Sequence, residues 1–306
     1  MVGHPRLGTR GSPLALAQAR KVASAIEVAQ HWEAGHIEIV PIKTSGDKIK
    51  DRPLAEVGGK GLWTKELDKA LLDGEVDFTV HSMKDVESER PDAIRLAAMR
   101  PRGDYRERLI GPESIEAIRT GATFGTSSPR RAAQLLAIRP DLRIVTLRGN
   151  VETRLDKVER GEVDATLLSS AGLRRLGLAN VGTPIPIDRL LPAPGQAAIG
   201  IECRSNDDMT LRMLQSINDA TTHAAVAAER AFTRALGASC SSPVAALAVL
   251  EGGKLRLRAE LYSADGTEKA EGEERFDCWD LAAPAQFARA LLQRAPGKVR
   301  ELFAGA

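Results

Sequence analysis

The order of apolar and polar positions along the chain predicts alternating strands and helices. The first third holds segments of strand or helix length at residues 6–9, 13–27, 37–42, 64–73 and 76–80. The middle third repeats the alternation with shorter turns, at residues 122–125, 129–138, 143–147, 151–159 and 163–168. Such alternation is typical of α/β proteins, in which helices cover both faces of a mostly parallel sheet. We therefore expect two sheets of this kind.

Two motifs occur once in each of these thirds. Residues 8–18 read GTRGSPLALAQ and residues 125–134 read GTSSPRRAAQ, and each is followed later by Gly-Glu-Val-Asp-x-Thr, at 74–79 and 161–166. Each copy predicts a strand, a hydroxyl-rich turn and a helix with Ser at the N-cap and Pro at its first position. The start of such a helix offers free backbone N–H groups to an anion. The duplication therefore predicts two related α/β domains, similar to periplasmic binding proteins, that face an anion-binding cleft.

The copies differ in one long polar insertion. Between Ser-Pro and Gly-Glu-Val-Asp the first copy spans 62 positions (12 to 74) and the second 33 (128 to 161), a difference of 29. Much of the excess lies at residues 43–61, which are rich in Lys, Asp and Gly. A long polar loop within a compact domain is usually a lid or a disordered insertion.

The last third predicts a small α+β domain. A connector at 184–195 contains four prolines, and a strand at 198–202 is expected to return to the first domain. Beyond it we expect helices and strands at residues 224–235, 244–250, 255–262 and 285–294, with a hairpin turn at Asp265-Gly266. The expected domains are residues 1–99 with 195–216, residues 100–194, and residues 217–306.

Composition narrows the class of protein. The 306 residues are 43% hydrophobic and 27% charged, and the net charge of +2 is too small for a typical nucleic-acid-binding protein. No apolar run approaches membrane-spanning length. Three widely spaced cysteines without a CxxC pair, and five histidines without metal-ligand spacing, predict neither a disulfide framework nor a metal site. We expect a cytoplasmic protein.

The strand at 76–80 runs into His81-Ser82-Met83-Lys84-Asp85. A carboxylate and an ammonium group at the carboxyl end of a strand are suited to acid–base chemistry in a cleft. A surface ion pair in a solvated turn is the alternative for Lys84 and Asp85. The pattern leaves both open, whereas His81 is expected to pack or to form a hydrogen bond rather than act as a base.

Arginines follow three successive strands of the second copy. They are Arg130 and Arg131 after the first, Arg148 and Arg154 after the second, and Arg174 and Arg175 after the third. Guanidinium groups bind carboxylates and phosphates with two parallel hydrogen bonds. Scattered surface arginines are the alternative, but clustering at consecutive strand ends favours an anionic ligand, with Arg10 on the opposite side of the cleft.

Cys240 stands in a loop of small residues, Gly-Ala-Ser-Cys-Ser-Ser-Pro, that leaves its sulfur accessible. A lone cysteine is usually structural, so the spacing alone assigns it no function. Lys60 follows Gly59, but Leu54 breaks the phosphate-loop pattern, which disfavours a nucleotide-dependent enzyme.

Taken together, these motifs resemble the porphobilinogen deaminase (hydroxymethylbilane synthase) family. The similarity runs from Leu7 to the final helix and is strongest at residues 9–18, 57–67, 81–86, 125–131, 147–154, 171–177 and 191–204. The resemblance implies three domains and a transferase that condenses four porphobilinogen molecules head to tail with loss of ammonia. It further implies a covalent dipyrromethane primer, held by a thioether to Cys240, and a monomer.

The resemblance also assigns roles to residues. Asp85 matches the family's catalytic aspartate, which stabilises the azafulvenium-type cation formed when ammonia leaves. The cofactor- and substrate-binding positions would be Arg10, Ser12, Gln18, Lys60, Trp63, Ser82, Lys84, Thr126, Ser127, Ser128, Arg130, Arg131, Arg148, Gly149, Arg154, Ala171, Arg175 and Gln196. The chain departs from the family pattern around Cys240, at Glu87 where Pro is common, at Pro129, and at Ala197 where Gly is frequent.

A non-catalytic two-domain protein that binds anions or polycarboxylates is the competing hypothesis. Such proteins share a duplicated cleft and hinge closure, but they need neither Asp85 nor Cys240.

Overall fold

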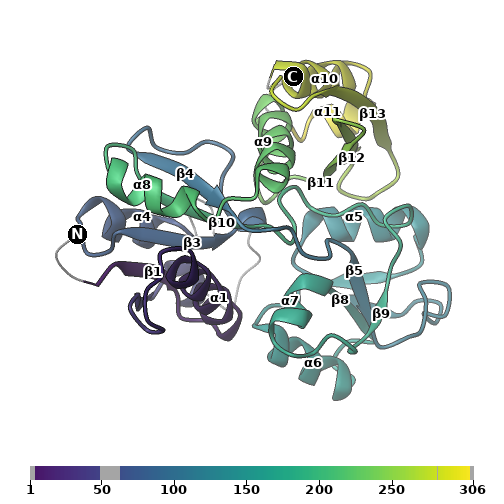
Figure 1. Ribbon diagram of the computed structural model, residues 1–306. Helices are drawn as coiled ribbons and strands as arrows, with labels where there is room; N and C mark the ends of the chain where they lie inside the picture. The colour runs from purple at the N-terminus through teal and green to yellow at the C-terminus, as the bar shows by residue number, and fades with distance from the viewer. Residues whose placement is uncertain (1–3, 49–62, 281, 304–306) are drawn as a thin grey trace. The chain divides into compact units, whose positions relative to one another are not determined.

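The computed structural model describes residues 4–48, 63–280 and 282–303. Within them, the residues up to Gly103 together with Ala197–His223 form one compact unit, called unit 1, and Asp104–Gln196 with the residues from Ala224 onward form unit 2. Figure 1 labels most elements of both units.

Unit 1 is built on a five-stranded sheet of order β2-β1-β3-β10-β4. Its strands are β1 (Arg6–Arg10), β2 (Glu38–Ile42), β3 (Phe78–Ser82), β4 (Ile94–Met99) and β10 (Ile199–Arg204). β1 pairs in parallel with β2 and β3, whereas β10 is antiparallel to β3 and β4. The returning strand predicted at 198–202 is thus the fourth strand of this sheet.

Helices cover both faces of this sheet. Leu7, Phe78 and Ile201 share a core with α1 (Pro13–Ala29) and α8 (Asp208–Gln215). On the other face, α4 (Lys65–Leu72) packs its buried leucine and alanine side chains near β2 and β4. The short elements of unit 1 are α2 (Ser45–Lys48) and the 3-10 turn η1 (Met83–Asp85).

Unit 2 contains a second five-stranded sheet of order β7-β6-β8-β5-β9. Its strands are β5 (Glu107–Ile110), β6 (Thr123–Gly125), β7 (Arg143–Val145), β8 (Ala165–Ser169) and β9 (Thr183–Pro184). One face packs against α5 (Pro129–Ile138), and the other packs against α6 (Val151–Glu159) and α7 (Ser170–Arg175). β6 is parallel to β7 and β8, and β5 is antiparallel to β8 and β9.

The two sheets therefore share one plan: three parallel strands, then an antiparallel fourth strand, then an edge strand. The fourth strand comes from the end of unit 1 in one sheet (β10) and from the start of unit 2 in the other (β5). This correspondence confirms the duplication read from the two sequence motifs.

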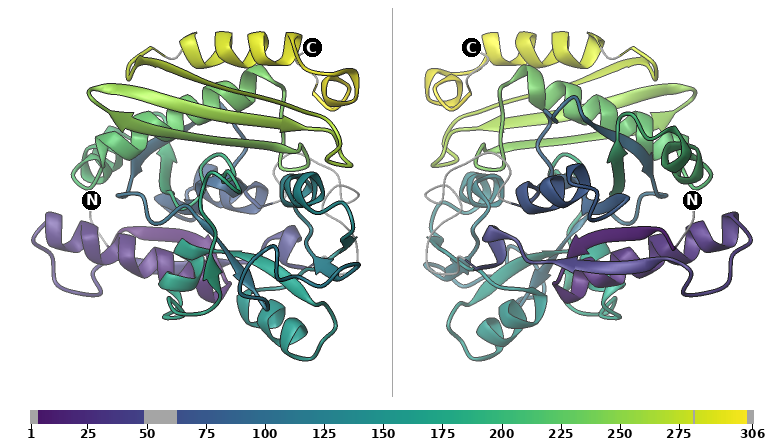
Figure 2. Two further views of the ribbon diagram at one scale, coloured as in Figure 1. Left: turned by 90° about the vertical axis from the view of Figure 1, so that its right-hand side faces the viewer. Right: turned by 90° about the vertical axis from the view of Figure 1, so that its left-hand side faces the viewer.

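A three-stranded antiparallel sheet completes unit 2, in the order β11 (Val244–Glu251), β12 (Lys254–Tyr262) and β13 (Lys269–Asp277). Alternate residues of β12, among them Leu257 and Leu261, share a core with α9 (Ala220–Ala235), α10 (Ala282–Gln293) and α11 (Gly297–Arg300). Figure 2 shows α10 along one face of this sheet. The predicted fold class, two related doubly wound α/β sheets with a small α+β C-terminal part, is confirmed.

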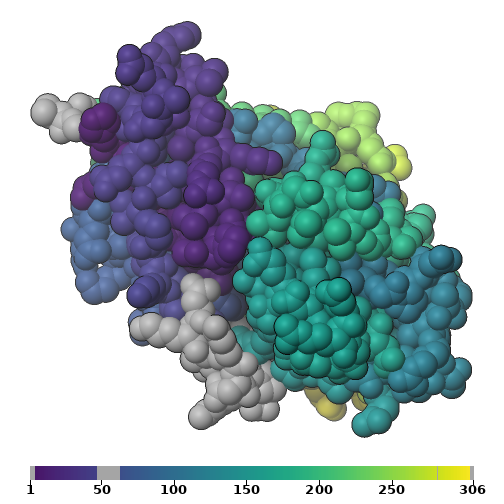
Figure 3. Space-filling model, turned by 90° about the horizontal axis from the view of Figure 1, so that it is seen from below, coloured from purple at the N-terminus to yellow at the C-terminus, as the bar shows by residue number. Residues whose placement is uncertain are grey.

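Figure 3 shows one face of the molecule coloured by residue number, with the N-terminal residues of unit 1 in purple and the middle third of the chain in teal. Within the described residues, no helix is both long and apolar enough to cross a membrane.

Candidate functional site

The turn after β1 has the predicted helix start. Ser12 is the N-cap of α1, and its Oγ accepts a hydrogen bond from the backbone N–H of Ala15 at 3.3 Å. The Arg10 guanidinium lies 4.0 Å from the centroid of the Trp63 ring. A cation over an indole face is an attractive contact. The structure therefore brings together Arg10 and Trp63, which are 53 positions apart in the sequence.

The carboxyl end of β3 carries the predicted acid–base pair. Lys84 and Asp85 lie half-buried in η1, directly after Ser82, whose Oγ is within 2.9 Å of the Gln18 side-chain nitrogen. The Met83 N–H donates to the carbonyl of Ala198 at 3.1 Å, so the residue before β10 holds this turn in place. A Cβ at Gly200 would lie 2.1 Å from the Met83 sulfur, which explains the glycine at this position of β10.

A buried ionic network lies behind the same turn. Arg90 bridges the Asp68 carboxylate of α4, at 3.0 Å from Nη1, and the Glu202 carboxylate of β10, at 2.9 Å from Nε and 2.7 Å from Nη2. Glu202 is fully buried, and a buried carboxylate is stable only when paired and hydrogen-bonded. Arg90 therefore fixes the segment after Asp85 to both α4 and β10. No local pattern in the sequence predicts this network, because Asp68, Arg90 and Glu202 lie far apart in the chain.

His81 completes the network as a neutral partner. Its Nε2 lies 2.9 Å from Thr79 Oγ1 and 3.3 Å from a Glu202 oxygen. Burial lowers the pKa of His81, although the neighbouring Glu202 carboxylate opposes that effect. The histidine is a buried, hydrogen-bonded residue, as the sequence predicted.

In unit 2, hydroxyl groups organise the turn after β6. Ser128 is the N-cap of α5 and its Oγ accepts from the Arg131 N–H at 3.4 Å. Thr126 Oγ1 accepts from the Ser128 N–H at 3.1 Å, and Ser127 Oγ donates to the Leu147 carbonyl at 2.9 Å. This turn matches the Ser-Pro helix start of α1, as the duplicated motif predicted.

Arg130 and Arg131, at the start of α5, share one buried carboxylate. Glu107 of β5 is fully buried; one of its oxygens lies 2.5 Å from Arg130 Nη2 and 3.0 Å from Arg131 Nε, and the other lies 2.7 Å from Arg131 Nη2. Both arginines are less than 10% exposed. Two guanidinium groups held by one carboxylate keep a net positive charge, which suits a site for an anion. Glu107 was not predicted, because a single Glu in a short strand carries no sequence signal.

The second arginine-bearing turn lies after β7. Asn150 is the N-cap of α6 and accepts from the Thr153 N–H at 2.8 Å. Arg154 Nε donates to the carbonyl of Gly149 at 3.0 Å, and Gly149 has a φ of 118°, a backbone conformation that favours glycine. Arg148 precedes this turn. Because β7 and β8 flank β6 in parallel, Arg148, Arg131 and Arg175 all follow the same edge of the sheet.

The remaining predicted positions of unit 2 lie near that edge or on the connector. Ala171 is buried in α7, and burial lowers the pKa of Arg175 at the end of this helix to about 10. Gln196 is fully buried, and its amide donates to the Tyr105 carbonyl at 2.8 Å.

Cys240 lies exposed in the turn between α9 and β11. Hydroxyl groups shape this turn, since the Ser239 N–H donates to Ser242 Oγ at 3.0 Å and the Ser241 N–H donates to Ser239 Oγ at 3.2 Å. Cys203, in contrast, is buried, and burial raises the pKa of its thiol to about 11. The thiolate is the reactive form of cysteine, so burial and a raised pKa disfavour reaction at Cys203, whereas Cys240 is exposed.

Lys60 falls outside the described residues. The other predicted positions divide between the units: Arg10, Ser12, Gln18, Trp63, Ser82, Lys84 and Asp85 lie in unit 1, and the arginine-rich turns, Gln196 and Cys240 lie in unit 2. Over residues 4–48, 63–280 and 282–303, no group of three or more His, Cys, Asp or Glu side chains is arranged to hold a metal ion.

Two family models match almost the entire chain. "Porphobilinogen deaminase, dipyromethane cofactor binding domain" matches residues 6–212, and "Porphobilinogen deaminase, C-terminal domain" matches residues 223–292. A periplasmic substrate-binding protein of an ABC transporter from Coxiella burnetii is 18% identical and covers 70% of this chain and 90% of its own, but its TM-score of 0.42 is too low to bear on function.

Curated relatives agree with these models. A porphobilinogen deaminase from Sphingopyxis alaskensis is 50% identical over 305 residues, which cover 98% of this chain and 96% of that protein. A chloroplastic porphobilinogen deaminase from Oryza sativa subsp. japonica is 47% identical over 268 residues, 86% of this chain and 75% of that protein. With its duplicated α/β sheets, its arginine-lined strand ends and these matches, the chain belongs to the porphobilinogen deaminase family.

Proposed function

We propose that this protein condenses four porphobilinogen molecules head to tail, releasing one ammonia at each step, and that water then releases the chain as the linear tetrapyrrole hydroxymethylbilane. Family membership supports the reaction class. The position of Asp85 is the observation that supports a role for individual residues. Asp85 is half-buried at the carboxyl end of β3, in a turn that β10 and the Arg90 network hold in place.

Asp85 is proposed as the catalytic residue. Each condensation breaks the bond between the aminomethyl carbon and the amine of porphobilinogen, and positive charge develops on the pyrrole. A carboxylate that accepts the pyrrole N–H stabilises this charge most effectively when it is fixed in advance. Lys84 directly precedes Asp85 and Ser82 lies three residues before it; both assist in binding, while Gln18 orients Ser82.

The arginines are proposed to bind the substrate's carboxylates. Every pyrrole of the growing chain carries an acetate and a propionate, so the product becomes a polyanion. Arg148, Arg154 and Arg175, with Arg130 and Arg131, place positive charge along one edge of the unit 2 sheet, and Arg10 adds a guanidinium in unit 1. Ser12, Thr126, Ser127 and Ser128 supply the helix starts beside these arginines.

The residues present fit the dipyrromethane cofactor of the family. An exposed cysteine among small residues suits a thioether, and the arginine-rich turns of unit 2 suit the carboxylates of two pyrroles. We propose that Cys240 holds this cofactor, which when bound supplies the free pyrrole carbon on which elongation begins. Gly149, Ala171, Gln196, Trp63 and Lys60 complete the proposed binding positions.

We further propose the three domains expected from the sequence, residues 1–99 with 195–216, 100–194 and 217–306. The proposed protein is a cytoplasmic monomer that requires no metal ion. A non-catalytic anion-binding protein is not favoured, since the family models match both the cofactor-binding and the C-terminal parts.

A turnover assay tests the proposed function. Purified protein incubated with porphobilinogen should release ammonia and consume substrate, with Asp85→Asn strongly impaired. Binding of porphobilinogen without ammonia release would support the anion-binding alternative instead.

A further inference from the structure

The C-terminal sheet has a polar face that contacts α5. Alternate residues of β12 point into the core shared with the helices, namely Leu255, Leu257, Ala259 and Leu261. Glu260 and Tyr262 therefore lie on the opposite face of the sheet or at the rim of this core. There the Glu260 carboxylate accepts two hydrogen bonds on one oxygen, from the Tyr262 hydroxyl at 2.7 Å and from the Gln134 amide at 3.0 Å. Glu260 thus joins a helix and a strand that are 126 positions apart.

The same network reaches the arginine pair. Gln134 Oε1 accepts from Arg130 Nη1 at 2.8 Å, and Arg130 in turn contacts Glu107. A continuous series of hydrogen bonds therefore runs from Glu107 through Arg130, Gln134 and Glu260 to Tyr262. Gln134 and Tyr262 are almost fully buried, and an unmatched polar group in such surroundings costs about 1–3 kcal/mol. The series is thus held in one arrangement.

At its far end, the network meets the segment that carries Cys240. The Tyr262 N–H donates to the Pro243 carbonyl at 3.1 Å, three residues after Cys240, and Val244 pairs with Leu261. A second contact fixes the same strand to α5, because a Cβ at Gly266, in the turn after β12, would lie 2.4 Å from the Ala133 carbonyl oxygen. Both the helix that carries Arg130 and the turn that carries Cys240 are thus attached to the end of β12.

We propose that Gln134, Glu260 and Tyr262 are positioning residues that set the spacing between the Cys240 turn and the arginine pair, Arg130 and Arg131. The proposal rests on the proposed function, in which Cys240 holds a cofactor whose carboxylates those arginines bind. A ligand tethered at one end gains a high effective concentration at its second site only when the spacing matches its length. Loss of the fixed spacing slows capture of the cofactor without removing either attachment point.

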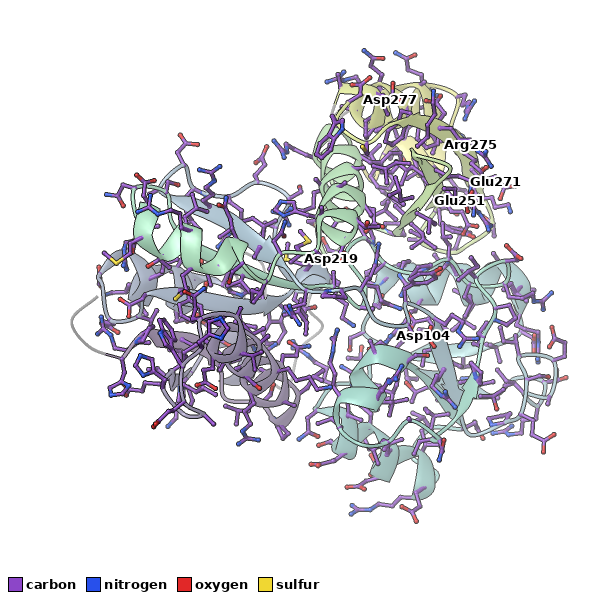
Figure 4. The ribbon with its side chains drawn as sticks, viewed as in Figure 1. Asp104, Asp219, Glu251, Glu271, Arg275 and Asp277 are labelled. Atoms are coloured by element: carbon purple, nitrogen blue, oxygen red, sulfur yellow. The ribbon has the colours of Figure 1, made fainter. Side chains whose placement is uncertain are left out.

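The variants are chosen to distinguish a positioning role of these residues from a general loss of protein stability. Burial and the adjacent Glu260 carboxylate raise the pKa of Tyr262 well above its usual value, so its hydroxyl remains a donor throughout the assay range. Tyr262→Phe removes only this donor, and Glu260→Gln removes the charge while keeping the shape. Glu251→Gln is the matched control: Glu251, labelled in Figure 4, pairs with Arg256 and Arg275 and lies at the β11–β12 hairpin, whereas Glu260 lies near the other end of β12.

The experiment follows cofactor loading by intact mass. Protein lacking the cofactor is mixed with preformed hydroxymethylbilane, and the fraction carrying the added mass is measured over time. We expect Tyr262→Phe and Glu260→Gln to load about tenfold more slowly than wild type, a factor that corresponds to about 1.4 kcal/mol, and Glu251→Gln to load at the wild-type rate. Alkylation of Cys240 by iodoacetamide should proceed at one rate in all four proteins, because the turn itself stays accessible.

Three results discriminate among explanations. Wild-type loading rates in both Tyr262→Phe and Glu260→Gln would overturn the inference and leave the proposed function intact. Slower alkylation in parallel with slower loading would also overturn it, because reduced access to the Cys240 thiol would then explain both. Absence of loading in the wild type would contradict the proposed function itself.

Discussion

The Arg131 guanidinium binds both carboxylate oxygens of Glu107, through Nε at 3.0 Å and Nη2 at 2.7 Å. Arg130 shares one of those oxygens, so a single buried carboxylate holds two buried cations. Removing the partner of a buried charge is more costly than never having had the pair, because the remaining charge stays desolvated.

This relationship predicts a large loss of stability for Glu107→Gln. The change leaves two buried guanidinium groups without a carboxylate and is expected to reduce the free energy of unfolding by about 3–5 kcal/mol. Chemical denaturation measures it. Asp104→Asn is the control, three residues earlier, where Asp104 pairs with the half-exposed Arg106 (Figure 4). Equal losses in the two variants would contradict the assigned role of Glu107.

Asp85→Asn is expected to lower kcat by a factor on the order of 10²–10³ while cofactor and substrate still bind, because an amide lacks the charge that stabilises a cation. Steady-state ammonia release measures kcat, and intact mass reports bound cofactor. Glu89→Gln, an exposed carboxylate in the same segment, should keep wild-type turnover. Near-normal turnover in Asp85→Asn would remove Asp85 from the mechanism.

The lowered pKa of buried His81 leads to a prediction for how the stability of the protein depends on pH. Burial lowers the pKa of His81 in the folded state, and the nearby Arg90 guanidinium lowers it further. The carboxylates of Glu202, Asp68 and Asp85 partly oppose this lowering. The unfolded chain therefore binds a proton more readily, and stability should fall as the pH drops below about 6.5, by up to about 1.4 kcal/mol per pH unit. Urea titrations at several pH values measure the slope. His81→Asn should flatten it, and an unchanged slope would contradict this assignment.

The backbone conformation of Ala197 leads us to expect that glycine at this position stabilises the protein. Its φ of 69° lies in the left-handed region, which disfavours side chains with a Cβ and admits glycine freely. Ala197→Gly should therefore raise the free energy of unfolding, by up to about 1 kcal/mol after the added chain entropy of glycine. Neighbouring Ala198 is buried without a positive φ, so Ala198→Gly should destabilise. Thermal unfolding of both variants gives the signs, and a loss in Ala197→Gly would contradict the argument.

The sequence predicted the helices and strands that depend on local signals, such as helix caps and the spacing of apolar residues. The helices α5 and α6 begin and end where expected, because Ser128 and Asn150 cap them and their apolar residues recur with helical spacing. Strand β13 was not predicted: only Ala270 and Phe276 of its nine residues are well buried, and an edge strand of this kind shows no hydrophobic alternation. Strands β4, β5 and β9 were not predicted either.

The candidate site divides in the same way. Arginines at strand ends follow directly from the sequence, because parallel strands end at one edge of a sheet. The groups that hold them in place do not, since Glu107 lies 24 positions from Arg131 and Glu260 lies 126 from Gln134. Only tertiary packing brings such pairs together, and each member alone looks like an ordinary polar residue.

The most direct test of the proposed function is the intact mass of the protein under denaturing conditions. Wild-type protein from a host that makes porphobilinogen should carry added mass equal to two deaminated porphobilinogen units. Cys240→Ser should lack this mass, and Cys278→Ser, at a second cysteine of the same C-terminal part, should keep it. An adduct that persists in Cys240→Ser, or a wild type that stays unmodified after incubation with porphobilinogen, would contradict the account.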